Sequence, residues 1–239
     1  MAYIEGFVAP VSNANRDNYV AHCKKAAPLF RRIGASRVVD GWEDDIADGK
    51  VTDFRRAVAA TAGEAVSFGW FEYPDKATRD AANEQMNNSP EFVDMGQSMP
   101  FDGQRLIFGG FEAFVDERGA GDGGYVDGFV LPVPGARRDD YREMASKAAK
   151  VFIEYGASRV VEAWADDVPH GKVTDFWRSV NAEPGEQVVF SYIEWPSRAA
   201  RDDAWKKVMA DERMKPDMAN MPFDGQRMFW GGFQRINDA

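Results

Sequence analysis

The heptapeptide Met99-Pro-Phe-Asp-Gly-Gln-Arg105 occurs a second time, without a single change, at Met221–Arg227. Its Pro and Asp-Gly predict a turn. Near the start of the chain, Tyr3-Ile-Glu-Gly-Phe-Val8 returns with two conservative changes as Tyr125-Val-Asp-Gly-Phe-Val130. Both strings recur at the same distance along the chain, and such internal repetition decides the architecture before any local pattern does.

A single shift of 122 positions aligns residues 3–117 with residues 125–239 without a gap, and 53 of these 115 pairs are identical. Units of this length exceed the roughly 20–50 residues of a solenoid repeat. The sequence therefore predicts one domain in residues 1–118 and a second in residues 125–239, joined by the Gly-rich segment 119–124. The natural interpretation is a dimer whose two subunits have become one chain.

The composition limits the class of protein. With 239 residues, of which 44 % are apolar, the chain can bury a substantial core. Its 29 basic and 39 acidic side chains give a net charge of −10, and no segment is rich in Lys or Arg. Because such a chain is poorly suited to neutralising phosphates, we expect no nucleic-acid partner and no membrane partner.

Cysteine usage and the N-terminal residues favour a cytoplasmic location. Cys23 is the only cysteine, which excludes an intrachain disulfide and a cysteine-based zinc site. The first residues lack a basic region followed by an apolar stretch, and no long apolar run occurs elsewhere. We therefore expect a cytoplasmic protein without a membrane span.

Within one copy the periodicity predicts strand, helix, strands, helix and strand. Apolar residues at helical spacing, with Tyr19 and Tyr141 at equivalent positions, predict a helix in residues 15–33 and in its repeat. This β-α-β-β-α-β order, with an extra strand before the hairpin, is typical of a ferredoxin-like α+β unit. In the first copy the expected strands are 3–11, 36–42, 53–58, 66–73 and 105–114, and the second helix is 75–88.

Both faces of the predicted sheet are apolar. Neighbouring strand residues such as Val38 and Val39 must point to opposite faces. The two helices of a ferredoxin-like unit cover one face, so the other face needs a second cover, and the other copy is available for it. We therefore predict that the two repeats pack sheet to sheet as an intrachain pseudo-dimeric α+β barrel. Such chains could also associate further into a homo-oligomer.

Several strings that occur in both copies resemble one known family. They are Gly-Ala-Ser-Arg-Val-Val, Gly-Lys-Val-Thr-Asp-Phe, Arg-Asp at 79–80 and 201–202, and the two strings quoted first. They are similar to the YbaA-type family, domain-of-unknown-function family 1428 of the dimeric α+β barrel superfamily. The resemblance covers nearly all of each copy, although typical members are single copies. It implies a ferredoxin-like fold and the pairing of two units, and it supplies no reaction.

No catalytic residue can be assigned from the sequence. A nucleophile needs an adjacent base, commonly His, and His22 and His170 each occur in one copy only. The acid pairs Asp44-Asp45 and Asp166-Asp167 offer oxygen ligands for a hard cation, but they lack EF-hand spacing, and a solvated loop explains them. We therefore expect no metal site, and no cofactor is indicated.

Carboxylates in the middle of predicted strands are more informative, because charged residues are uncommon there. In one interpretation they pair with arginines across strands, so that no charge is buried alone. In the other, some of them line a cavity in which burial raises the pKa for acid–base chemistry. The ligand-binding candidates are these carboxylates together with neighbouring arginines and aromatic residues. They are Glu5, Asp40, Trp42, Arg56, Trp70, Glu72, Asp127, Glu162, Trp164, Arg178, Tyr192 and Glu194.

Three classes of function are compatible with these residues. The chain could bind a small apolar or aromatic molecule in a cleft between sheet and helices. It could be a cofactor-free enzyme of the dimeric α+β barrel type that uses strand carboxylates, which rests on analogy of fold. It could also be a structural or interaction protein with no pocket. A pocket lined by Trp42, Trp70 and Glu72 favours the first two classes, whereas carboxylates all matched to arginine favour the third; we favour the binding module.

Overall fold

Eight strands from the two copies form one closed barrel in the computed structural model, which describes residues 2–215, 217 and 220–239. The first copy contains β1 (Tyr3–Ser12), η1 (Asn13–Asn15), α1 (Arg16–Arg32), β2 (Arg37–Ile46), α2 (Phe54–Ala57), β3 (Glu64–Tyr73), α3 (Lys76–Asn88), α4 (Pro90–Gln97) and β4 (Ile107–Arg118). The second contains β5 (Tyr125–Pro134), η2 (Gly135–Arg137), α5 (Arg138–Glu154), β6 (Arg159–Asp167), α6 (Phe176–Ser179), β7 (Glu186–Trp195), α7 (Arg198–Ala210), η3 (Glu212–Met214) and β8 (Phe229–Asp238).

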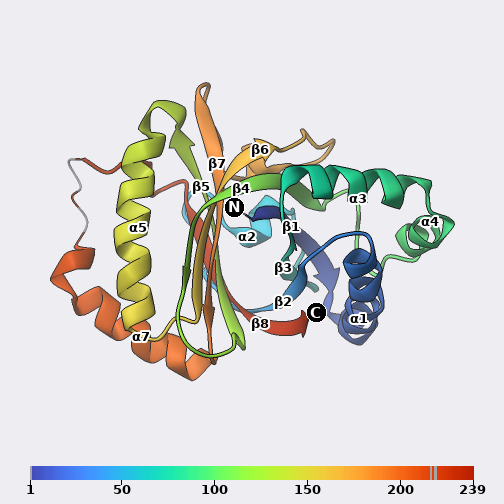
Figure 1. The fold of residues 1–239 in the computed structure, drawn as a ribbon, viewed down its shortest axis with the longest axis horizontal. Coiled ribbons are helices and arrows are strands. Elements are labelled where there is room, and N and C mark those ends of the chain that lie inside the picture. The colour runs from blue at the N-terminus through green and yellow to red at the C-terminus, as the bar shows by residue number, and fades with distance from the viewer. Residues whose placement is uncertain (1, 216, 218–219) are drawn as a thin grey trace.

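The two copies complete each other's sheets. Around the barrel the strands follow the order β1-β3-β2-β8-β5-β7-β6-β4, so that β2 pairs with β8 and β4 pairs with β6. Without the other copy these strand edges would be unpaired, which invites association with another chain. The predicted intrachain pseudo-dimeric barrel is confirmed. Its longer helices flank the strands, with α5 and α7 on one side and α1, α3 and α4 on the other (Figure 1).

The barrel interior is an aromatic core built from both copies. Phe68 and Phe190, equivalent residues of the repeat, stack with ring centroids 4.7 Å apart and planes 7° apart. Gly6 faces the Phe190 ring, and a Cβ atom there would lie 2.7 Å from it; at Gly128 the corresponding distance to Phe68 is 2.8 Å. Only glycine permits so close an approach, which explains the glycine in each copy of the repeated Tyr-x-x-Gly-Phe-Val string.

The strand predicted at residues 53–58 is wrong, because this segment forms the short helix α2. The Asp53 side chain accepts a hydrogen bond from the backbone N–H of Arg56 at 2.8 Å, which caps the helical turn. Phe54 and Val58 are both fully buried, and residues four apart share one face of a helix as well as one face of a strand. Alternation over six residues therefore could not distinguish the two conformations.

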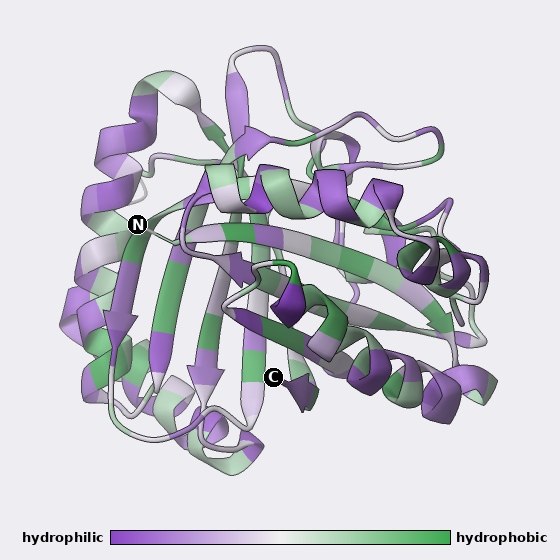
Figure 2. Ribbon diagram, turned by 45° about the vertical axis from the view of Figure 1, so that its right-hand side comes forward, coloured by the Kyte–Doolittle hydropathy of each residue, from purple (hydrophilic) through white to green (hydrophobic). Residues whose placement is uncertain are grey.

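The flanking helices are amphipathic, and hydrophilic and hydrophobic segments alternate along them (Figure 2). In α1 the buried side chains that face the sheet include Tyr19, Cys23 and Ala27. Among residues 2–215, 217 and 220–239, no helix has the length and apolar character needed to cross a membrane.

A polypeptide of residues 1–118 is expected to form a dimer. Alone, it would expose the edges of β2 and β4 and the apolar face that carries Phe68, and a second copy can cover all three. Size-exclusion chromatography with light scattering measures the mass, with the intact chain as the reference. A stable monomer of residues 1–118 would contradict the role given to the opposite copy.

Candidate functional site

The structure distributes the candidate residues over four separate places. One end of the barrel holds Trp70, Glu72, Tyr192 and Glu194. Helices α3 and α7 lie over Glu5 and Asp127. Arg56 and Arg178 donate hydrogen bonds to the backbone of the segments that lead into α2 and α6. Helices α1 and α5 lie over Asp40, Trp42, Glu162 and Trp164.

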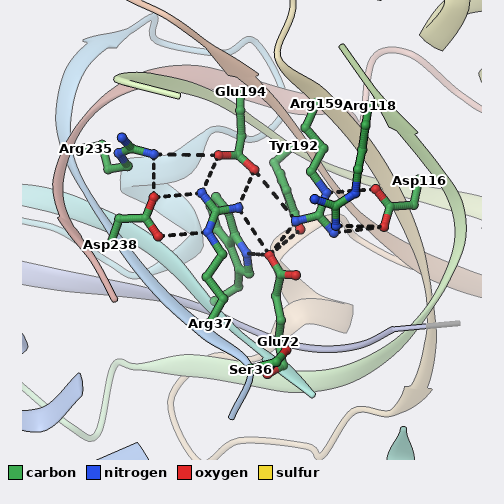
Figure 3. Close-up of polar contacts among 11 residues, drawn as sticks. Ser36, Arg37, Glu72, Asp116, Arg118, Arg159, Tyr192, Glu194, Arg235 and Asp238 are labelled. Atoms are coloured by element: carbon green, nitrogen blue, oxygen red, sulfur yellow. Dashed lines mark hydrogen bonds and ion pairs between the residues drawn. The ribbon is translucent and has the colours of Figure 1, made fainter. Parts of the chain in front are cut away.

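At one end of the barrel, a buried and a half-buried arginine bind carboxylates of the opposite copy (Figure 3). Arg159 of the second copy donates to Glu72 of the first at 2.6 Å and to both oxygens of Asp116 at 2.8 and 2.9 Å. Only 4 % of the Arg159 side chain is exposed, so these charge-assisted bonds are little screened. Burial is the largest single influence and acts to raise the pKa of Glu72. The charge and hydrogen bond of Arg159, the hydrogen bond from Trp70 and the charge of Arg37 together hold this pKa below its ordinary value.

The same arrangement recurs in the other direction. Arg37 of the first copy binds both oxygens of Glu194 at 2.7 and 2.6 Å and both oxygens of Asp238 at 2.8 Å. Beside it, the Trp70 and Tyr192 rings stack at 3.9 Å, and both are fully buried. The Trp70 indole nitrogen donates into this network at 3.0 Å. These residues join the two copies, as the pairing interpretation of the strand carboxylates expects.

Arg56 and Arg178 take no part in that network. They follow the caps of α2 and α6, where Arg56 donates to the Gly49 carbonyl at 2.7 Å and Arg178 donates to the Gly171 carbonyl at 2.8 Å. Arg56 also lines an open, charged hollow of about 530 Å³ beside α2. The interpretation that strand carboxylates pair with arginines across strands does not apply to these two arginines, because their segments are helical.

Glu5 and Asp127 lie on the outer face of the sheet beneath α3 and α7. Arg201 of α7 donates to Asp127 at 2.9 Å, whereas Arg79 of α3 lies 3.7 Å from Glu5. The same arginines reach acids of the opposite copy, with Arg201 2.8 Å from Asp45 and Arg79 2.7 Å from Asp167. The repeated acid pairs therefore contact cations of the protein itself. Within the described residues, no three or more His, Cys, Asp or Glu side chains are grouped to hold a metal ion.

Asp40 and Glu162, at equivalent positions of β2 and β6, have a different environment. In the described part of the chain, neither has an Arg, Lys or His partner within ion-pair distance. Asp40, which is 6 % exposed, accepts a hydrogen bond from Asn237 at 3.0 Å, and Glu162 accepts one from the Tyr141 hydroxyl at 2.7 Å. Burial raises the pKa of Asp40 to about 6 and that of Glu162 to about 7. Both groups therefore change charge near neutral pH.

Aromatic and hydroxyl side chains surround these two carboxyl groups. In the first copy the Tyr19 hydroxyl lies 2.6 Å from Ser67 Oγ, and the Tyr19 ring lies 6.0 Å from Trp42. An arginine lies over the tryptophan of each site, Arg16 at 5.5 Å from Trp42 and Arg138 at 5.3 Å from Trp164. The two sites thus share a carboxyl group, a tyrosine and a tryptophan stacked against a cation.

The repeated heptapeptide closes one end of each site. Phe101 packs edge-on against Tyr19 at 5.9 Å, and Phe223 packs edge-on against Tyr141 at 5.8 Å. The arginine that ends each heptapeptide forms a bidentate pair with a glutamate, Arg105 with Glu64 and Arg227 with Glu186. A turn explains the Pro and Asp-Gly, and these contacts explain the phenylalanine and the arginine.

Sequence reasoning selected the carboxylates and tryptophans of these sites but missed Tyr19, Tyr141, Phe101 and Phe223. The signal was present, because each is identical in the two copies and the tyrosines lie on the sheet-facing stripe of their helices. A carboxyl group that titrates near neutral pH beside aromatic walls can take a proton from a bound hydroxyl group. That is the chemistry the arrangement offers.

Comparisons with known proteins agree with the duplication and with the fold. The family model "Protein of unknown function (DUF1428)" matches the chain twice, over residues 2–103 and 124–225. The uncharacterized protein YbaA of Escherichia coli K12 is 60 % identical over 114 residues, which are 48 % of this chain and 97 % of YbaA. A structure described as a candidate monooxygenase of Fusobacterium nucleatum is 10 % identical and covers 99 % of this chain and 93 % of its own, with a TM-score of 0.62. Another from Lactobacillus acidophilus is 12 % identical and covers 100 % and 95 %, with a TM-score of 0.61. These two structures share the fold alone.

Proposed function

This chain belongs to the DUF1428 family, whose description names no reaction, so we propose a function from the side chains of this chain. The chain binds a small phenolic molecule between the sheet and helix α5, where Glu162 accepts the phenolic proton. The equivalent space beneath α1, with Asp40, is a second site of the same kind. This proposal combines the binding module with the cofactor-free enzyme, the first two classes that the sequence left open.

A contrast between carboxylates carries the proposal. Glu72, Glu194 and Asp127 each accept a hydrogen bond from a buried or half-buried arginine. Glu162 instead lies against a hydroxyl group, with no cation beside it in the described part of the chain. A general base works best when its pKa lies near the working pH, and burial places the pKa of Glu162 at about 7.

The surroundings favour a phenol as the ligand. The Tyr141 hydroxyl already donates to Glu162 at 2.7 Å, and a phenolic ligand would form the same O–H···O bond. Phe114 packs edge-on against Trp164 at 6.0 Å, which provides apolar walls for a ring. Glu162 is partly exposed whereas Asp40 is buried, so the site of the second copy is the more accessible one.

The similar folds described as candidate monooxygenases suggest dioxygen as the second substrate. With a hydroquinone, two electrons and two protons pass to O₂, which gives a quinone and hydrogen peroxide without a bound cofactor. Removal of the first proton by Glu162 makes the hydroquinone a stronger reductant. In this scheme Glu162 supplies general-base catalysis, and Tyr141 and Trp164 position the ring.

Glu162→Gln is expected to weaken hydroquinone binding at pH 8 by at least about tenfold and to abolish any oxygen uptake, because the amide cannot accept a proton at this position. Titration calorimetry measures binding, and an oxygen electrode measures turnover. Glu143→Gln, on the exposed side of the same helix, is the matched control. Binding of hydroquinone, catechol and phenol that is unchanged in Glu162→Gln and in Asp40→Asn would refute the proposal.

A second candidate function is that of an interaction protein without a ligand. The observation in its favour is the barrel itself, where Trp70 and Tyr192 are fully buried and Glu72 and Glu194 are bound by arginine. Failure of every phenol to bind the intact chain would favour this function over the first.

A further inference from the structure

A buried carboxylate beneath α7, that of Asp127, accepts hydrogen bonds from the indole groups of tryptophan side chains. Asp127 accepts hydrogen bonds from the indole nitrogens of Trp195 at 2.9 Å and Trp205 at 2.8 Å. Arg201 Nε donates to the same carboxylate at 2.9 and 3.1 Å. Since Asp127 is fully buried, these donors satisfy a charge that water cannot reach.

The equivalent carboxylate of the first copy, Glu5, lacks close donors. Tyr73 stands where the second copy has Trp195, and Asn83 stands where it has Trp205. Asn83 Nδ2 lies 3.5 Å from Glu5, and the nearest arginine nitrogen, of Arg79, lies at 3.7 Å. The buried Arg79 Nε has no acceptor in hydrogen-bonding geometry among the described residues, although Asp80 forms an ion pair with it at 3.0 Å. A buried donor and a nearly enclosed acceptor are thus both poorly satisfied at one position.

The aromatic walls of the indole site are nevertheless present in the first copy. In the second copy the Trp205 ring packs against Phe152 at 5.2 Å and Trp230 at 6.2 Å. Their equivalents are Phe30 and Phe108, and both are accessible: Phe30 is partly exposed and Phe108 is 47 % exposed. Asn83 replaces the indole, and Phe71 replaces Ile193 beside Phe30.

We propose that the first copy binds a planar aromatic molecule with a ring N–H, of the indole class, at the place equivalent to the Trp205 side chain. The ligand N–H donates to Glu5, and the ring lies between Phe30 and Phe108. Phe71, which packs against Phe30 at 4.3 Å, adds a further aromatic wall. This site lies beneath α3, apart from the phenol sites beneath α1 and α5, so it does not depend on the proposed function.

Free indole titrated into the intact chain tests this site by calorimetry. We expect one indole per chain, loss of binding in Asn83→Trp, whose own ring fills the place, and at least about tenfold weaker binding in Glu5→Gln. The double variant Phe71→Ile/Asn83→Trp carries the residues of the second copy at both of these positions, and it is the variant to use if Asn83→Trp alone does not fold. Absence of indole binding to the intact chain, or binding that survives in both tryptophan variants, would overturn the proposal.

The second copy offers the reverse experiment. Trp205→Asn removes the built-in indole and leaves Asp127 with Arg201 and Trp195 as donors. We expect the stoichiometry to rise from one indole to two. A folded Trp205→Asn variant that still binds a single indole would contradict the equivalence of the two positions.

Discussion

Replacing Arg159 with methionine lowers the free energy of unfolding by about 3–5 kcal/mol, because Glu72 and Asp116 then lose their closest cation. The cations that remain lie farther away, Arg37 at 3.4 Å from Glu72 and Arg118 at 3.6 Å from Asp116. The effect is large because the Arg159 side chain is only 4 % exposed and water cannot take its place. Urea unfolding at pH 7, followed by tryptophan fluorescence, measures the change. A loss below about 1 kcal/mol, the range of exposed pairs, would contradict this account.

Two further variants separate lost charge compensation from lost packing. Adding Glu72→Gln to Arg159→Met removes one uncompensated charge, so we expect the double variant to recover part of the lost stability. Arg37→Met removes the equivalent arginine, which is 22 % exposed, and we expect a smaller loss there because water replaces part of the interaction. Equal losses at Arg37 and Arg159 would show that burial does not set the size of the effect.

The architecture was predictable because it follows from patterns spread over the whole chain. The repeat establishes two equivalent units, and adjacent apolar residues such as Val38 and Val39 show that each sheet needs two covers. The contacts that join the copies could not be predicted in the same way, since Arg37 and Asp238 are 201 positions apart and Arg159 and Glu72 are 87 apart. The sequence pattern predicts neither contact, because both contacts depend on how the barrel closes.

The candidate carboxylates were predictable as a set, but their division into different environments was not. Strand alternation places Glu72 on the same face as Trp70, and Asp40 on the same face as Trp42. Alternation does not predict that Glu72 meets an arginine of the opposite copy. Nor does it predict that Asp40 lies beneath a helix and has no arginine partner among the described residues. The cation opposite a strand residue is supplied by another strand or another copy, so only the assembled barrel distinguishes the two cases.

The Asp40→Asn variant is expected to be more stable than the wild type at pH 8 and equally stable near pH 4. Burial raises the folded-state pKa of Asp40 from 3.8 to about 6. Between these values the folded state keeps a proton that the unfolded state has released, so the wild type loses stability as the pH rises through this interval. A shift of about two pH units corresponds to roughly 3 kcal/mol, and Asn avoids this cost at pH 8 because it carries no charge.

Urea unfolding from pH 4 to pH 8 measures this difference, and two other variants test its sign. Glu162→Gln should gain stability over a higher interval, because the pKa of Glu162 is raised from 4.5 to about 7. Glu64→Gln should behave in the opposite way, since hydrogen bonds from Arg105 lower the pKa of Glu64 to about 2. It should lose stability at pH 7, and this loss should disappear as the pH falls toward 2. An Asp40→Asn effect of the same size at pH 4 and pH 8 would show that the Asp40 charge is not penalised by burial, and would remove the reason to assign proton transfer to this position.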